Sequence, residues 1–266
     1  MSSVQQGRPD DRWITLDGVV NMRDLGGLPT RSGERTAYGR LIRSDNLQDL
    51  SPADVRTLVD EYDVRDIVDL RTEDEVRVTG KGPLWAEESL AHHHHSLIER
   101  LSGAVTTTTA AEDALAVVKG ARRDAKFWAD HYAGYLDRRA DSVSAAIEVI
   151  ARSEGATIVH CAAGKDRTGT IVALTLDAVG VAPEAIVEDY ALTAERLEQI
   201  IERLMSSESY AMALRTQRLE DQLPRRETME SILAMLHDQH GGAAEWLRAQ
   251  GWRPDDLDRL RRKLVG

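Results

Sequence analysis

Short apolar stretches between polar turns predict the strands of this chain. The clearest are residues 64–70 (VRDIVDL) and 156–160 (ATIVH), which are rich in β-branched side chains and stop at polar residues. Further strands are expected at residues 13–20, 38–43 and 91–98. Residues 21–27 (NMRDLGG) end in a glycine pair and predict a loop.

Apolar residues at helical spacing predict helices between and after these strands. Ser51 and Pro52 mark one helix start, with serine as N-cap and proline at the first helical position, and this helix should reach about residue 62. Other helices are expected at residues 111–119, 123–138, 142–153, 170–179, from 183 onward, 194–206, 226–240, 243–250 and 254–264. Alternating strands and helices indicate an α/β fold, with a central, mostly parallel sheet flanked by helices and a C-terminal helical layer. Since no repeat or linker divides the chain, we expect a single domain over residues 1–266.

Composition excludes several classes of protein. The chain has 266 residues and a net charge of −11, which disfavours nucleic acid as a partner because binding there depends on clustered Lys and Arg. It contains no apolar run of ~20 residues, so no membrane span is expected. A single cysteine excludes a disulfide framework, and the polar start lacks the apolar core of a signal peptide. We therefore expect a cytoplasmic protein, or one exported without a cleaved signal.

The run from His160 to Gly169 (HCAAGKDRTG) carries the candidate chemistry. It lies between a predicted strand and a predicted helix, where successive backbone N–H groups and the helix dipole can hold an anion. Cys161 at the base of such a loop tends to ionise, and Arg167 at its rim can bind a phosphate through two nitrogens. The intervening glycine, Gly164, permits the backbone angles that a tight loop needs.

These features predict a nucleophilic cysteine with a phosphate cradle. Cys161 is the expected nucleophile, Arg167 the expected phosphate ligand, and Thr168 a donor that stabilises the thiolate when it leaves. A buried core thiol is the alternative for a lone cysteine. The expected phosphate-binding residues are Ala162, Ala163, Gly164, Lys165, Arg167 and Thr168.

The run HCAAGKDRTG resembles the signature loop of the cysteine-based protein tyrosine phosphatase superfamily. Within it, the sequence is most similar to a group of bacterial tyrosine and phosphoinositide phosphatases. The segments NMRDLGG, RSDNL (43–47), DLRTEDE (69–75), VEDYALT (187–193) and GGAAEWLRAQGW occur in the order that this group shows. The resemblance spans nearly the whole chain. It implies the phosphatase-type α/β fold and a site covered by a helical pair, here about residues 108–140.

Protonation of the leaving group requires an acid, and three aspartates compete for this role. Asp166 lies within the loop, one residue before Arg167, and the resemblance implies that it is the acid; the alternative is that its hydrogen bonds only brace the loop. Asp69 ends a strand, where α/β sheets place their ligands, but it can instead pair with Arg71 or cap a loop. Asp130 follows Trp128 and Ala129, a faint echo of the acid loop of other tyrosine phosphatases, although the segment is predicted to be helical.

Other polar residues have supporting roles in this interpretation. Lys165 adds a second cation and, by resemblance to lipid phosphatases, hints at phosphoinositides; a solvated loop lysine is the alternative. His160 is expected to hold the loop, and the Asn, Arg and Asp of segments 21–27 and 43–45 to anchor it from below. The four histidines at 92–95 alternate in direction on a strand, so they cannot all bind one ion. The threonines at 106–109 favour a hinge for a helical lid.

The sequence thus predicts a metal-independent and cofactor-independent phosphomonoesterase that forms a phosphocysteine. The expected partners are a phosphotyrosine protein, a phosphoinositide, or a phosphoserine or phosphothreonine protein as substrate, and inorganic phosphate as product. A phosphoinositide-selective lipid phosphatase is the main alternative. A sulfurtransferase and a silent phosphate-binding module are the remaining ones.

Overall fold

The computed structural model describes residues 12–98, 124–215 and 218–266. Its centre is a five-stranded sheet in the order β1-β2-β5-β3-β4, in which β1 is antiparallel to β2 and the other pairs are parallel. The strands are β1 (Arg23–Asp24), β2 (Leu41–Ser44), β3 (Val64–Asp69), β4 (Ala91–His94) and β5 (Ala156–His160). The predicted α/β fold with a mostly parallel sheet is confirmed.

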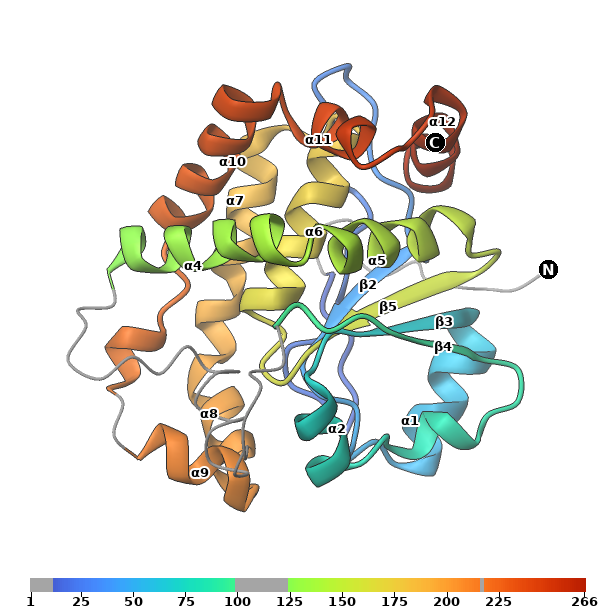
Figure 1. Cartoon of the computed structure of the whole chain (residues 1–266). Coiled ribbons are helices and arrows are strands. Elements are labelled where there is room, and N and C mark those ends of the chain that lie inside the picture. The colour runs from blue at the N-terminus through green and yellow to red at the C-terminus, as the bar shows by residue number, and fades with distance from the viewer. Residues whose placement is uncertain (1–11, 99–123, 216–217) are drawn as a thin grey trace.

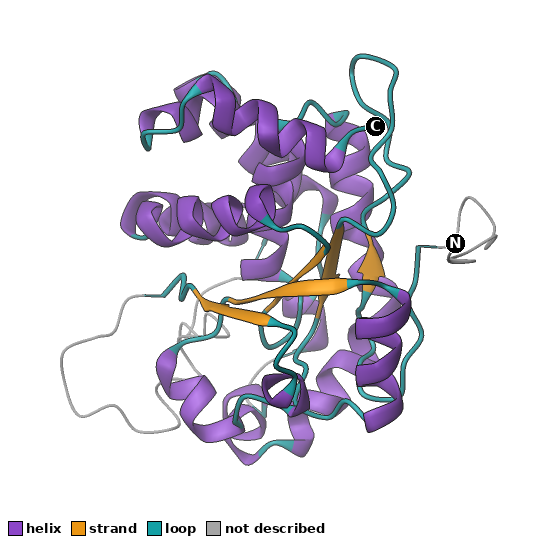
Figure 2. Cartoon of the chain, turned by 90° about the vertical axis from the view of Figure 1, so that its right-hand side faces the viewer, coloured by secondary structure: helices purple, strands orange, loops and turns teal. Residues whose placement is uncertain are grey.

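Helices cover both faces of this sheet (Figure 1). They are α1 (Pro52–Arg56), α2 (Glu73–Thr79), α4 (Ala125–Arg138), α5 (Ala140–Arg152), α6 (Asp166–Ala178), α7 (Pro183–Leu192), α8 (Leu197–Ser206), α9 (Glu208–Leu214), α10 (Arg226–His240), α11 (Ala243–Ala249) and α12 (Pro254–Leu264). α1 and α2 lie on one side, and the larger group around α4 to α7 lies on the other. Figure 2 shows the strands between these two layers. None of the helices in the described residues is both long and apolar enough to cross a bilayer.

Neighbouring residues of the inner strands belong to different hydrophobic clusters. Ile67 and Ile158 pack with the residues of α1, whereas Val68 and Val159 pack with α4, α5 and α6. Successive side chains on a strand point to opposite faces, so a fully apolar strand supplies both layers. This explains why residues 156–160 are all buried.

The predicted strand at residues 13–20 is wrong. Only isolated bridges form there, because residues 17 and 18 make a turn. The backbone N–H groups of Asp17 and Gly18 donate to the carboxylate of Asp54, at 3.1 and 3.0 Å. A side-chain acceptor thus replaces the neighbouring strand that these amides would otherwise need.

Two helix boundaries bear directly on the site. α6 begins at Asp166, four residues before the predicted start at 170, because the loop runs into the helix without a break. α2 was not predicted, although Thr72 and Glu75 form a capping box at its start. Both differences place charged residues in the first turn of a helix.

The predicted lid falls partly on residues that can be placed. The threonines at 106–109 and the predicted helix at 111–119 lie outside the described residues. Residues 125–138 form α4, whose Trp128, Tyr132 and Tyr135 are buried in the main hydrophobic cluster. The α4 part of the predicted lid is therefore a core helix in this structure.

Candidate active site

The loop from Cys161 to Lys165 joins β5 to α6 at the carboxyl edge of the parallel strands. Ligands of open α/β sheets bind at this edge. Cys161 is 2% exposed and comes directly after the central strand β5. The first turn of α6 follows at once, so its free N–H groups and the positive end of its dipole lie beside the thiol.

Three successive carbonyl groups of the loop point outward. In a trans peptide the C=O and the following N–H lie on opposite sides, so the N–H groups of residues 163–165 turn inward. Inward N–H groups form the concave site that binds anions. The bonds that hold the carbonyls are Asn46 N–H to Ala162 O (3.1 Å), Asn21 Nδ2 to Ala163 O (3.0 Å) and Arg43 Nη2 to Gly164 O (2.7 Å).

Gly164 is required by both backbone angle and space. Its φ is +64°, in the left-handed region that favours glycine. A Cβ there would stand 2.5 Å from the carbonyl oxygen of Ser44 and 2.6 Å from the backbone nitrogen of Asp45. The loop can therefore lie against the end of β2 only with glycine at this position.

A buried ion cluster fixes the residues that hold the loop. Asp189 of α7 accepts from Arg23 at 3.1 Å and from Arg43 at 2.7 Å, and all three side chains are almost fully buried. Burial alone would raise the pKa of Asp189, but the arginines Arg23, Arg43 and Arg12 hold it well below its usual range. Arg23 also donates to the Asn21 side chain at 2.7 Å. Asn21 and Arg43 thus hold loop carbonyls, as predicted for segments 21–27 and 43–45, whereas Asp24 and Asp45 bond backbone groups outside the loop.

Apolar side chains of two further helices pack against the loop. Ala162 and Ala163 form a small cluster with Ile200 and Leu204 of α8 and with Tyr210 of α9. Small side chains let these helices approach the loop closely. α8 and α9 thus pack directly against the cradle.

Arg167 is held by a carboxylate from the opposite layer. Its guanidinium makes two bonds to Glu75 of α2, at 2.5 and 3.0 Å, and a third to the carbonyl of Leu70 at 3.3 Å. Tyr210 donates to the same carboxylate at 2.7 Å. Burial alone would lower the pKa of Arg167, but Glu75 raises it well above its usual value. The guanidinium is therefore charged and fixed in orientation.

Asp166 is bonded to a tyrosine of α4. The hydroxyl of Tyr132 donates to Asp166 Oδ1 in a short hydrogen bond and lies 2.8 Å from the hydroxyl of Tyr190 of α7. All three residues are buried, with Asp166 7% exposed.

Lys165 is directed at the segment that precedes α10. Its ammonium donates to the backbone oxygen of Gln222 at 2.8 Å and to the Gln222 side chain at 3.0 Å. It also lies 4.4 Å from the ring centre of Trp128 and 3.5 Å from Asp166 Oδ1. Lys165 is 2% exposed, so the alternative that it is a solvated loop lysine is wrong.

Asp69 is engaged by Arg71, one of the alternatives considered for it. Arg71 Nη2 lies 2.6 Å from its carboxylate, and His160 Nε2 lies 3.7 Å away. Burial alone would raise the pKa of Asp69, but His160 and Arg71 hold it well below its usual range. Burial also lowers the pKa of His160 to about 4, so its ring is neutral at pH 7. These values disfavour Asp69 as a proton donor.

Asp130 lies away from the loop. Its side chain is 66% exposed on α4 and pairs with Lys126 at 2.8 Å, one turn earlier in the helix. Trp128, close to it in sequence, points instead into the core. The structure thus brings Cys161, Asp166 and Arg167 together and leaves Asp130 outside.

Thr168 and the histidine run complete the predicted set. Oγ1 of Thr168 is buried and has no hydrogen-bond partner among the described residues.

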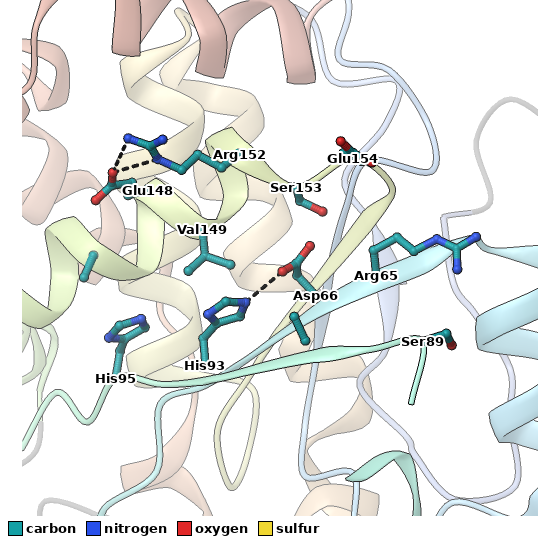
Figure 3. Close-up of a pocket in the computed structure, with 12 residues that line it drawn as sticks. Arg65, Asp66, Ser89, His93, His95, Glu148, Val149, Arg152, Ser153 and Glu154 are labelled. Carbon is teal, nitrogen blue, oxygen red and sulfur yellow. Dashed lines mark hydrogen bonds and ion pairs between the residues drawn. The ribbon is translucent and has the colours of Figure 1, made fainter. Parts of the chain in front are cut away.

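His93 and His95 point into a cavity of about 530 Å³ between β4 and α5, and His93 bonds Asp66 at 2.8 Å (Figure 3). His92 and His94 line a different cavity. Within the described residues, no group of three or more His, Cys, Asp or Glu side chains is arranged to hold a metal.

Three residues that bond the loop side chains were not predicted from the sequence: Glu75, Tyr132 and Gln222. A signal existed for Glu75, since it closes the capping box with Thr72 inside the motif DLRTEDE. No local pattern marked Tyr132 or Gln222, which meet the loop only through tertiary packing.

A sequence model of the tyrosine phosphatase family matches residues 14–266. The chain therefore belongs to the tyrosine phosphatase family, and the resemblance drawn from HCAAGKDRTG is confirmed at that level.

Two relatives place the chain within this family. It is 26% identical to the "Triple specificity protein phosphatase PtpB" of Mycobacterium tuberculosis over 280 aligned positions, covering 94% of this chain and 98% of the relative. It is 34% identical to a "Tyrosine-protein phosphatase" of Nostoc commune over 124 positions, covering 44% of this chain. The chain spans only 41% of the length of the Nostoc relative.

Proposed function

We propose that this chain is a cysteine-dependent phosphatase that acts through a phosphocysteine on Cys161. The observation that carries the proposal is the arrangement around the thiol. Three outward carbonyls leave inward N–H groups, and Glu75 holds Arg167 at the rim in a charged, fixed state. N–H groups and a guanidinium fixed in advance stabilise the charge of a transferring phosphoryl group.

In the proposed reaction the Cys161 thiolate attacks phosphorus and the P–O bond to the leaving group breaks. Asp166 gives its proton to the leaving oxygen, and water then cleaves the phosphocysteine to yield inorganic phosphate and the free thiol. Thr168 Oγ1 has a hydrogen to donate to the departing thiolate, which fits its lack of another partner among the described residues. Asp69 is a weaker candidate for the acid because its pKa favours the carboxylate.

Phosphotyrosine is the first substrate that we propose. The family membership supports it, and the printed name of the mycobacterial relative, with three specificities, supports a wider range that includes phosphoserine and phosphothreonine. Phosphoinositides form the second candidate class, supported by the buried cation Lys165 beside Asp166.

The test uses the purified chain and p-nitrophenyl phosphate. We expect hydrolysis that Cys161→Ser abolishes, with Asp130→Asn as a matched surface control that keeps wild-type turnover. Absence of hydrolysis by the wild-type chain would overturn the proposal. Conversion of thiosulfate to thiocyanate, measured in parallel, would instead support a sulfurtransferase.

A side-by-side assay of phosphotyrosine peptides and phosphoinositides then separates the two substrate classes. We expect turnover of the peptides. If only the phosphoinositides are hydrolysed, the proposed substrate class changes from phosphoprotein to lipid, and the proposed phosphocysteine reaction stands.

A further inference from the structure

We propose that Tyr132, supported by Tyr190, is a positioning residue that directs the transferable proton of Asp166 to a single carboxyl oxygen. This inference rests on the proposed function, in which Asp166 is the acid. It concerns α4, a helix that the sequence interpretation assigned to a lid.

The carboxyl group of Asp166 is bound on one oxygen only. Two groups of the described residues approach its Oδ1: Tyr132 through the short hydrogen bond, and Lys165 with its Nζ at 3.5 Å. Oδ2 is therefore the oxygen that remains for another proton or substrate atom. The two oxygens of this carboxyl group are chemically distinct before any substrate binds.

The direction of the hydrogen bonds follows from the state of the tyrosines. Burial, followed by the charge of Asp166, raises the pKa of Tyr132 well above its usual value, and the same two causes raise that of Tyr190. Both phenols are therefore neutral, and each has one hydrogen to donate. Because an ionised carboxylate can only accept, Tyr132 donates to Asp166 and Tyr190 donates to Tyr132.

This chain of donors acts in both protonation states of Asp166. As a carboxylate, Asp166 accepts the Tyr132 hydroxyl on Oδ1. When it gains a proton, the Tyr132 hydroxyl favours protonation of Oδ2, because Oδ1 then remains a carbonyl oxygen, which is a better acceptor than the oxygen of an O–H group. Tyr132 thus selects Oδ2 as the proton donor, and its removal would let the carboxyl group rotate or protonate on the wrong oxygen.

The surroundings make this contact rigid. Tyr132 is fully buried in the main hydrophobic cluster, and its ring packs against the rings of Tyr135 and Tyr190, with centres 6.1 and 6.3 Å apart. Aromatic pairs at such distances have preferred relative orientations, which restrict how the ring can move. The hydroxyl has few alternative positions.

The test compares Tyr132→Phe with Tyr135→Phe. The control removes a buried phenol one turn along the same helix, whose hydroxyl lies 2.8 Å from His131 Nε2. Both variants are assayed with phenyl phosphate, whose leaving group must be protonated, and with 2,4-dinitrophenyl phosphate, whose leaving group is stable as an anion. Circular dichroism and thermal unfolding establish that the variants fold.

We expect Tyr132→Phe to lower kcat on the order of tenfold for phenyl phosphate and less than about threefold for the dinitrophenyl ester. Tyr135→Phe, whose hydroxyl bonds His131 and not Asp166, should show no such difference between the two esters. In an Asp166→Asn background, Tyr132→Phe should cause no further leaving-group-dependent loss.

Two results would overturn the role of Tyr132. One is that Tyr132→Phe lowers kcat equally for both esters. The other is that it lowers kcat for phenyl phosphate as much in the Asp166→Asn background as in the wild type. If Tyr132→Phe does not fold, Tyr190→Phe tests the same chain of donors with a smaller expected effect. If Asp166→Asn lowers kcat equally for both esters, Asp166 is not the acid, and this inference fails with that assignment. An inactive wild-type chain would be a failure of the phosphatase proposal instead.

Discussion

The loop around Cys161 is held in two different ways on its two sides. Its backbone is held by residues that precede it in sequence and by the Asp189 cluster; we name Asn21, Arg43, Asn46 and Asp189 the cradle anchors. Its reactive side chains are held one by one; we name Glu75, Tyr132 and Gln222 the side-chain anchors.

The difference separates shape from chemistry. Asn21, Arg43 and Asn46 bind the loop carbonyl groups and Asp189 holds Arg43, so the cradle anchors determine where the loop N–H groups point and hence how an anion is held. The side-chain anchors bind Arg167, Asp166 and Lys165, so they determine the orientation and charge of groups that act on the substrate. Damage to the first set should weaken stability and anion binding, whereas damage to the second should lower turnover.

The largest expected effect is the loss of Asp189. Asp189→Ala leaves Arg23 and Arg43 buried without their counter-charge, which costs about 3–5 kcal/mol of the free energy of unfolding. Urea denaturation measures this cost. Asp130→Ala, which removes an exposed carboxylate, should change it by less than about 0.5 kcal/mol. A similar small change for Asp189→Ala would contradict the importance of the ion cluster.

The next effect falls on the side-chain anchors. Glu75→Gln removes the charge that holds Arg167 and should lower kcat/KM for p-nitrophenyl phosphate by about 10- to 100-fold, since small misplacements of a catalytic group are costly. Glu73→Gln, at an exposed position in the first turn of the same helix, is the control. Wild-type kinetics in Glu75→Gln would show that Arg167 needs no partner.

His160, which directly precedes Cys161, should make the free energy of unfolding depend on pH. Its pKa is about 4 in the folded chain against an ordinary value of 6.5, so the unfolded chain takes up the proton first as the pH falls. Its contribution is complete above pH 6.5 and is lost progressively toward pH 4. Between pH 7 and pH 5 the loss should be on the order of 2 kcal/mol. In His160→Asn the free energy of unfolding, measured by denaturation at each pH, should change less between pH 7 and pH 5. The same pH dependence in the variant and the wild type would refute the role of His160.

Asn21 tests whether the cradle anchors act on anion binding. Asn21→Ala removes hydrogen bonds to the Ala163 and Gly164 carbonyls and should weaken inhibition by vanadate about tenfold. Asn46→Ala is the matched control, because Asn46 holds the loop through its backbone N–H, which the substitution retains. A larger effect in Asn46→Ala than in Asn21→Ala would contradict the comparison.

The smallest effect concerns substrate choice. Gln222→Ala removes the side-chain acceptor of the Lys165 ammonium and keeps the backbone one, and it should raise phosphoinositide turnover relative to phosphotyrosine peptide by about two- to fivefold. Lys165→Ala should lower the same ratio. An unchanged ratio in both variants would remove Lys165 from substrate selection.

The sequence by itself determined the parts of the site that depend on neighbouring residues. A buried strand, a loop with Gly164 at a left-handed angle and a helix starting at the loop follow from local pattern and backbone geometry, and they place Cys161, Asp166 and Arg167 together. The family followed from this segment together with motifs along the rest of the chain, and the fold class followed from the alternation of strands and helices.

Only the tertiary structure decided which groups meet the loop side chains. Glu75 lies 92 residues from Arg167, Tyr132 34 from Asp166, and Gln222 57 from Lys165. No periodicity encodes such pairs, because they depend on how separate helices pack across the sheet edge. The same packing leaves Asp130 on the surface and turns Asp69 toward Arg71, although both were candidates of the right chemical type.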